Sequence, residues 1–130
     1  MKNAAGLTTI FVTLAMPAAA AAAAPGDMNA QAFYTDAQAV YAKGMAAMFD
    51  KRTRPLMAQL EDAGKRTRAE NQAATARGAP LYCVPPAERK KGMGPQQIIA
   101  LIGSVPAADR QRMTLAEAWR SAIIARYPCH

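Results

Sequence analysis

The sequence has 130 residues, with 16 Lys and Arg, 9 Asp and Glu and a single His, so its formal net charge is +7. This length is sufficient for one domain but not for two of ordinary size. The hydrophobic fraction of 52% overstates the available core, because 32 residues are Ala and ten of these precede Pro25. Only 15 Leu, Ile, Val and Phe follow residue 24. Such a thin core excludes a large buried active-site cleft and makes a covalent crosslink useful.

The first 24 residues have the pattern of a secretory signal peptide. Lys2 supplies a positive start, residues 7–16 are mostly apolar, and residues 18–24 are all Ala. This order predicts cleavage after one of residues 20–24. The apolar stretch is half the ~20 residues that a membrane-spanning helix needs. We therefore predict a signal peptide at 1–24 and one domain at 25–130, with a net charge of +6 and no membrane span.

Cys83 and Cys129 are the only cysteines of the chain. An even number of cysteines in a small exported protein suggests a disulfide. Closing a loop of about 47 residues stabilises a fold by roughly 4 kcal/mol. A metal site needs more ligands and a catalytic thiol needs a His partner, whereas the one His, His130, is the last residue. Free or intermolecularly bonded thiols are the alternative to one structural disulfide.

The sequence after the signal peptide alternates helix-forming stretches with residues that stop helices. Asn29 is positioned to cap a short helix that ends near Thr35. Thr35-Asp36-Ala37-Gln38 then has the form of a capping box, which predicts a second helix to about Met48. Gly44 weakens that helix and would let another backbone approach it closely.

A longer helix is predicted from Thr53 to Arg77, because Pro55 fits its first turn and Gly78 can end it. Its expected inner stripe has large side chains only in the first part, so the second part either packs very closely or projects into solvent. The members of this stripe are Leu56, Met57, Leu60, Ala63, Gly64, Thr67, Asn71 and Ala74.

The next part of the chain contains several prolines and glycines. Two consecutive prolines predict an extended conformation for residues 81–86. Residues 87–94 are predicted to form a basic, glycine-containing loop. A helix is expected at 95–103, followed by one further helical turn to about residue 112. The residues expected to point inward from the first of these are Ile98, Ile99 and Ile102.

A second capping box, Thr114-Leu115-Ala116-Glu117, opens the last helix, which Pro128 ends. The apolar face expected for this helix consists of Leu115, Ala118, Trp119, Ala122, Ile123 and Tyr127. No stretch alternates convincingly as a strand would. We therefore predict an all-α domain of four to five helices, closed by one disulfide between Cys83 and Cys129.

The C-terminal half carries a pattern that resembles a known family. The pattern consists of Tyr82-Cys83-Val84-Pro85-Pro86, Gln97 and Ile98, Pro106, Arg110, Ala116-Glu117-Ala118-Trp119 with Ala122, and Tyr127-Pro128-Cys129. Over these residues the chain is similar to the Rap/Tai-like type VI secretion immunity proteins, which are small, exported and all-helical. Tyr41 and Gly44 also match the Tyr-x-x-Gly of the family's first helix, although the further Cys usual there is absent.

The resemblance implies a periplasmic protein that binds and neutralises a cell-wall amidase toxin delivered by a rival or sibling cell. The expected partner is a protein, and a homodimer is compatible with the family. The basic charge supports a second hypothesis, a non-enzymatic envelope protein that binds anionic polymers or lipid headgroups. Binding of that second kind would weaken with salt.

Basic residues on the long helix are one candidate for partner binding. Arg54 and Lys65 are eleven residues apart, close to three helical turns, so they share a face. Arg66 lies beside them. The alternative is a solvated helix surface, because Glu61 and Asp62 precede Lys65 and Arg66 by four residues and can form ion pairs with them.

A second candidate is the basic run Arg89-Lys90-Lys91, because loops often carry binding residues. Its alternative is a run that only increases solubility. The sequence contains no nucleophile–His–acid arrangement, metal-binding motif or phosphate loop, so we predict no enzyme activity, no cofactor and no metal. Nucleic acid is not an expected partner, since no aromatic residues alternate with the charges.

Overall fold

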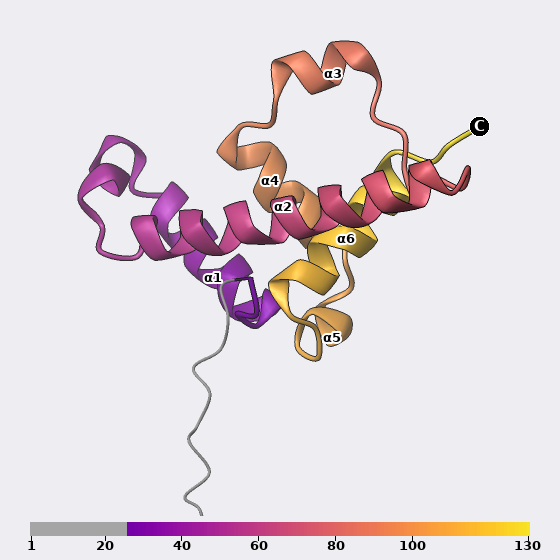
Figure 1. The fold of residues 1–130 in the computed structure, drawn as a ribbon. Helices are drawn as coiled ribbons and strands as arrows, with labels where there is room; N and C mark the ends of the chain where they lie inside the picture. Colours follow the sequence, from indigo (N-terminus) through magenta and orange to yellow (C-terminus); the bar gives the residue numbers. More distant parts are fainter. Residues whose placement is uncertain (1–25) are drawn as a thin grey trace, which may run out of the picture.

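The computed structural model describes residues 26–130, so the predicted signal peptide lies outside the described residues. Figure 1 shows that these residues form helices connected by short segments, which confirms the predicted all-α class. There are more helices than the four to five expected. They are α1 (Ala30–Tyr41), the 3-10 helix η1 (Gly44–Phe49), α2 (Thr53–Ala76), α3 (Pro86–Lys91), α4 (Pro95–Gly103), α5 (Ala107–Arg110) and α6 (Leu115–Arg126).

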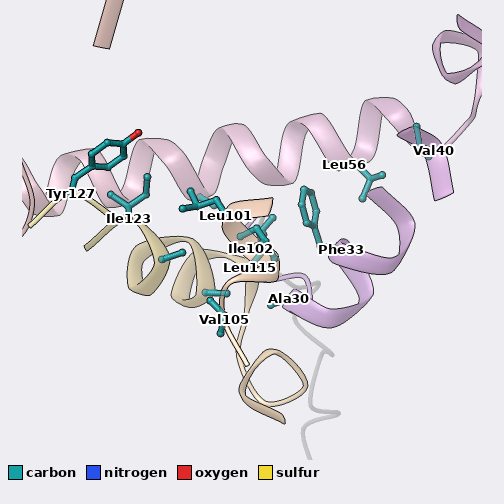
Figure 2. Packing of buried hydrophobic residues seen from close by; sticks show 13 residues of the cluster. Ala30, Phe33, Val40, Leu56, Leu101, Ile102, Val105, Leu115, Ile123 and Tyr127 are labelled. Atoms are coloured by element: carbon teal, nitrogen blue, oxygen red, sulfur yellow. The ribbon is translucent and has the colours of Figure 1, made fainter. Parts of the chain in front are cut away.

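The long helix α2 crosses the molecule (Figure 1). Helices α6 and α1 pack against α2, and α4 packs against α1 and α6. In Figure 2 the buried side chains form a row along α2, with Val40 at one end and Tyr127 at the other. The largest fully buried side chains are Ile102, Leu115 and Thr67. The core is therefore small but continuous, as the composition predicts.

The second half of α2 packs closely against α6 instead of projecting into solvent. Thr67 and Ala74 are both buried, and their small side chains allow the two helix axes to approach. In the first half, the prediction for Met57 was wrong, because its side chain is 62% exposed while Leu56 beside it is buried. Adjacent residues on a helix diverge by about 100°, so only one of the two faces the core.

The predicted break at Thr35 is wrong, because α1 runs without interruption from Ala30 to Tyr41. The side chain of Asn29 accepts hydrogen bonds from the backbone N–H groups of Gln31 and Ala32, so the helix is already capped upstream. Extending an existing helix costs less free energy than nucleating a new one, and nothing between Asn29 and Thr35 breaks it.

The capping box at Thr114 is confirmed. The hydroxyl of Thr114 accepts from the N–H of Glu117 at 3.2 Å, and the Glu117 carboxylate accepts from the N–H of Thr114 at 2.8 Å. The predicted ends of α2 and α4 are confirmed as well, with Gly78 at a φ of +78° just beyond α2.

The two threonine boxes make a matched pair for mutation. We expect Thr114→Ala to lower the free energy of unfolding by about 1 kcal/mol, because it removes a helix cap. Thr35→Ala is expected to change it by less than about 0.5 kcal/mol, because Thr35 lies exposed inside a helix where Ala is a better helix former. Urea unfolding followed by circular dichroism measures both values, and equal losses would contradict these assignments.

The inward faces of α4 and α6 differ in part from the prediction. On α4 the buried residues are Leu101 and Ile102, whereas Ile98 and Ile99 are only half-buried. On α6 the expected face is buried except for Trp119, which is half-buried and packs against the edge of the core. The described residues contain no helix that is both long enough and apolar enough to cross a membrane.

Candidate functional site

Cys83 and Cys129 form the predicted disulfide, with their Cα atoms 5.0 Å apart. It joins the extended segment before α3 to the chain just after α6. The N–H of Cys83 also donates to the carbonyl of Tyr127 at 2.8 Å. The chain that begins at Cys83 is therefore fixed to the end of α6 by one covalent bond and one hydrogen bond.

Residues 84–94, which we call the arch, stand away from the helical body between the disulfide and α4 (Figure 1). The predicted basic loop is wrong in one respect, because Pro86–Lys91 forms the short helix α3. The second proline of the pair sits at the first helical position, where its missing N–H leaves no bond unmade. Glu88 in the first turn and basic residues in the last turn complement the helix dipole, and Gly92, at a φ of +68°, follows the helix.

Asn71 of α2 holds the segment that leads into the arch. Its side-chain oxygen accepts from the N–H groups of Leu81 at 2.8 Å and Tyr82 at 3.2 Å, and its side-chain nitrogen donates to the carbonyl of Tyr82 at 3.1 Å. The sequence analysis placed Asn71 in the inner stripe of the long helix and missed this role. A side-chain amide within an otherwise small and apolar stripe was the available signal, since a buried amide needs partners.

The arch presents the three predicted cations Arg89, Lys90 and Lys91, all of them exposed. The one acid of the arch, Glu88, is exposed as well, and the three cations outnumber it. The Glu88 carboxylate near its hydroxyl, together with burial, raises the pKa of Tyr127. The outward charge of the arch is therefore positive.

A groove of about 720 Å³ lies between the arch and the helical body. Its apolar wall comes from residues of α4 and α6, such as Leu101 and Ala122. Its charged lining residues are Arg89, Lys91 and Glu88 from the arch and Arg126 from α6, so cations outnumber acids. This combination suits a protein segment that carries a carboxylate beside an apolar side chain.

The predicted basic stripe of α2 is divided by the structure. Arg66 forms ion pairs with Asp27 at 2.9 Å and Asp62 at 2.6 Å, and the hydrogen bond with Asp27 raises its pKa. Lys65 pairs with Glu61 at 2.7 Å, as the four-residue spacing predicts. Arg54 is exposed at the beginning of α2, near η1. The three residues therefore do not form one uninterrupted row of unpaired cations.

Helix η1 places apolar side chains at the surface. The helix predicted to reach Met48 ends at Tyr41, and Gly44, at a φ of +56°, begins the 3-10 turn instead. The close approach of another backbone that we predicted at Gly44 is wrong, because nothing lies within 4 Å of the position that a Cβ would take there. A second groove of about 470 Å³, lined mainly by apolar residues of α1, α2 and α4, lies beside η1.

Comparisons with protein-family models, with curated proteins and with solved structures found no match to this chain. Within residues 26–130, no three His, Cys, Asp or Glu side chains are grouped so that they could hold a metal ion. The arch, with its basic surface and its groove, is the candidate functional site that best combines charge, an apolar wall and a fixed position.

Proposed function

We propose that this chain is an exported binding protein that acts in the periplasm by blocking a secreted enzyme, without catalysing a reaction itself. The proposed target is a cell-wall amidase of a type VI secretion system, the partner implied by the resemblance of residues 82–129. That resemblance is an analogy at the level of the family, and the structure supports the proposal independently through the arch.

The observation that carries the proposal is the anchoring of the arch. The disulfide and the hydrogen bonds to Tyr127 and Asn71 fix one end of the arch, and α4 continues from the other. A binding segment that is already held in position loses less conformational entropy when a partner binds. Preorganisation of this kind is a general way in which a binding protein gains affinity.

The charge of the arch specifies the kind of surface that it would bind. Arg89, Lys90 and Lys91 are exposed, and Arg89 and Lys91 also line the groove, so the arch carries three cations against the one acid Glu88. Complementary charge accelerates association and disfavours other partners. The proposed target therefore presents an acidic patch beside its active site, with an apolar side chain that enters the groove.

The test is a triple variant, Arg89→Ala, Lys90→Ala and Lys91→Ala, assayed against candidate amidases from the same genome. We expect its affinity for the target to fall roughly 100-fold, about 2.7 kcal/mol, because three cations at the centre of the interface are lost. The matched control is Lys65→Ala, Arg68→Ala and Arg77→Ala, which removes the same charge from two exposed positions of α2 and from the exposed residue that follows it. Calorimetric titration measures both affinities.

Cells that produce the amidase in the periplasm supply a second readout. The wild-type chain and the α2 control should protect them, whereas the arch variant should not. Failure of the wild-type chain to protect against any amidase of that genome, together with no complex in pull-down, would contradict the proposed function. Equal losses in the two triple variants would show that net charge, and not the arch, determines binding.

A further inference from the structure

Three large apolar side chains project from η1, and we call them the apolar tip: Met45, Met48 and Phe49. Their exposed fractions are 82%, 72% and 88%. In Figure 1 η1 lies at the outer end of the molecule, beyond the beginning of α2 and away from α6. None of the three side chains carries a group that forms strong hydrogen bonds. Exposed apolar side chains gathered in one place mark an interaction surface more often than single ones do.

The tip is held in this exposed position by polar contacts beneath it. The carboxylate of Asp50 pairs with Lys43 at 2.6 Å and with Arg52 at 3.0 Å, and Arg52 reaches Asp36 of α1 at 3.3 Å. These contacts, with the Arg52 hydrogen bond largest, hold the pKa of Asp50 far below its ordinary value. The hydroxyl of Thr53 donates to the carbonyl of Ala47 at 2.6 Å. The turn is thus tied to α1 and α2, while its apolar side chains face outward.

The charges next to the tip are positive. Residues 43–54 contain four basic residues and one acidic residue, a net charge of +3. The acid, Asp50, is neutralised by its ion pairs, and its side chain is 4% exposed. Lys51 and Arg54 are exposed and form no ion pair with any described residue. An outward apolar group is therefore bordered by the cations Lys51 and Arg54, while the carboxylates of Asp50 and Asp36 are both paired with Arg52.

We propose that the apolar tip docks on the surface of an anionic phospholipid membrane. Phe49 and the two methionines enter the boundary between headgroups and acyl chains, and Lys51 and Arg54 contact lipid phosphates. Apolar burial combined with attraction to anionic headgroups is the general basis of interfacial binding. The charge beside the tip selects this occupant, because Lys51 and Arg54 complement the phosphates of an anionic membrane at the border of side chains that can enter its apolar layer.

This surface is separate from the arch, so the proposal goes beyond the proposed function. Membrane docking by the tip would leave Arg89, Lys90 and Lys91 available to a protein partner. Loss of lipid binding and loss of amidase binding are then expected from different variants.

The experiment measures co-flotation of the protein, purified from the periplasm with its N-terminus verified by mass spectrometry, with vesicles. One set contains phosphatidylglycerol and phosphatidylcholine at about 3:7, and the other contains phosphatidylcholine alone. We expect binding at least tenfold stronger to the anionic vesicles. Met45→Ser, Met48→Ser and Phe49→Ser together should reduce that binding at least tenfold, because the variant has no large apolar side chains at the tip to bury in the membrane.

Charge variants separate docking at the tip from general attraction. Lys51→Gln with Arg54→Gln should reduce binding about 25-fold, near fivefold for each cation. Lys90→Gln with Lys91→Gln removes the same charge from the arch and should change binding less than threefold. In addition, the emission of a Phe49→Trp variant should shift to the blue with anionic vesicles only, whereas the wild-type chain, whose one tryptophan is Trp119, should show no such shift.

Two results would overturn the proposal. One is equal flotation with the two kinds of vesicle, or none with either. The other is an equal loss in the two charge variants, which would assign binding to net charge. Circular dichroism of each variant, compared with the wild-type spectrum, identifies any variant that fails to fold, and the Phe49→Trp spectrum decides the question without a loss-of-function variant.

Discussion

Replacement of both Cys83 and Cys129 by Ser is expected to lower the free energy of unfolding by about 4 kcal/mol. The bond joins positions 46 residues apart, so its removal frees a large loop in the unfolded state. Both residues are exposed, so the serines leave no buried cavity and no unpaired buried hydroxyl. A small domain with a thin core has little stability in reserve, and a loss of this size is a large part of it.

Urea unfolding of the oxidised wild-type protein and of the double variant, followed by circular dichroism, measures this loss. Wild-type protein treated with a reductant serves as the control and should unfold with the variant. Hydrogen exchange should also increase in residues 81–94, because the arch loses its covalent anchor. A decrease in the free energy of unfolding below about 1 kcal/mol would contradict the stabilising role given to the disulfide, which is to restrict the conformations of the unfolded chain.

Arg110→Ala is expected to lower the free energy of unfolding by about 3 kcal/mol. Arg110 is buried, and its guanidinium donates to the side chain of Gln31 at 2.8 Å and to the carbonyls of Gly103, at 3.1 Å, and Val105. It also lies 4.3 Å from the centroid of the Tyr34 ring. One side chain thus joins the end of α4 to α1, and its loss leaves buried carbonyl groups without a donor.

Two further variants test whether the planar geometry of the Arg110 guanidinium is responsible for this stabilisation. Arg110→Lys keeps the charge but cannot supply the same planar set of donors, so we expect it to lose most of the same stability. Arg112→Ala removes an exposed arginine that pairs only with Asp109 among the described residues, and its expected cost is below about 0.5 kcal/mol. Thermal unfolding should show a decrease of roughly 15 °C for Arg110→Ala. Equal effects of the two alanine variants would contradict the role given to Arg110.

The parts of the fold that the sequence predicted are those set by local chemistry. Gly78, Pro95 and Thr114 each have one preferred place at a helix end and occupy it in the structure, and Pro55 lies in the first turn of α2 as predicted. The disulfide was predicted from the number of cysteines and the expected compartment. These features require only neighbouring residues, or a simple count, to be recognised.

The features that sequence reasoning missed depend on contacts between distant residues. Thr35 has the form of a helix cap, but Asn29 had already begun the helix before it. Arg110 belonged to the family pattern, yet its partners at Gln31 and Gly103 come together only in the folded chain. The exposure of Phe49 follows from the 3-10 turn at Gly44, which the helical spacing of the methionines concealed.

The candidate site was predicted in part. The cations Arg89, Lys90 and Lys91 were identified as one group, and the structure places them together on α3. Their presentation on an anchored arch was not predicted, because it depends on the hydrogen bonds of Asn71 and on the bond between the N–H of Cys83 and the carbonyl of Tyr127. Lys65 and Arg66 show the converse case, since the acids four residues before them were visible in the sequence and do pair with them.

The central claim is that this chain works outside the cytoplasm as a binding protein whose contact surface is held by one disulfide. Peptide mapping by mass spectrometry of protein recovered from the periplasm, without reduction, tests it most directly. The expected result is an N-terminus created by cleavage after one of residues 20–24, together with a peptide pair linked through Cys83 and Cys129. A cytosolic product that keeps Met1 and carries two reduced cysteines would contradict the account.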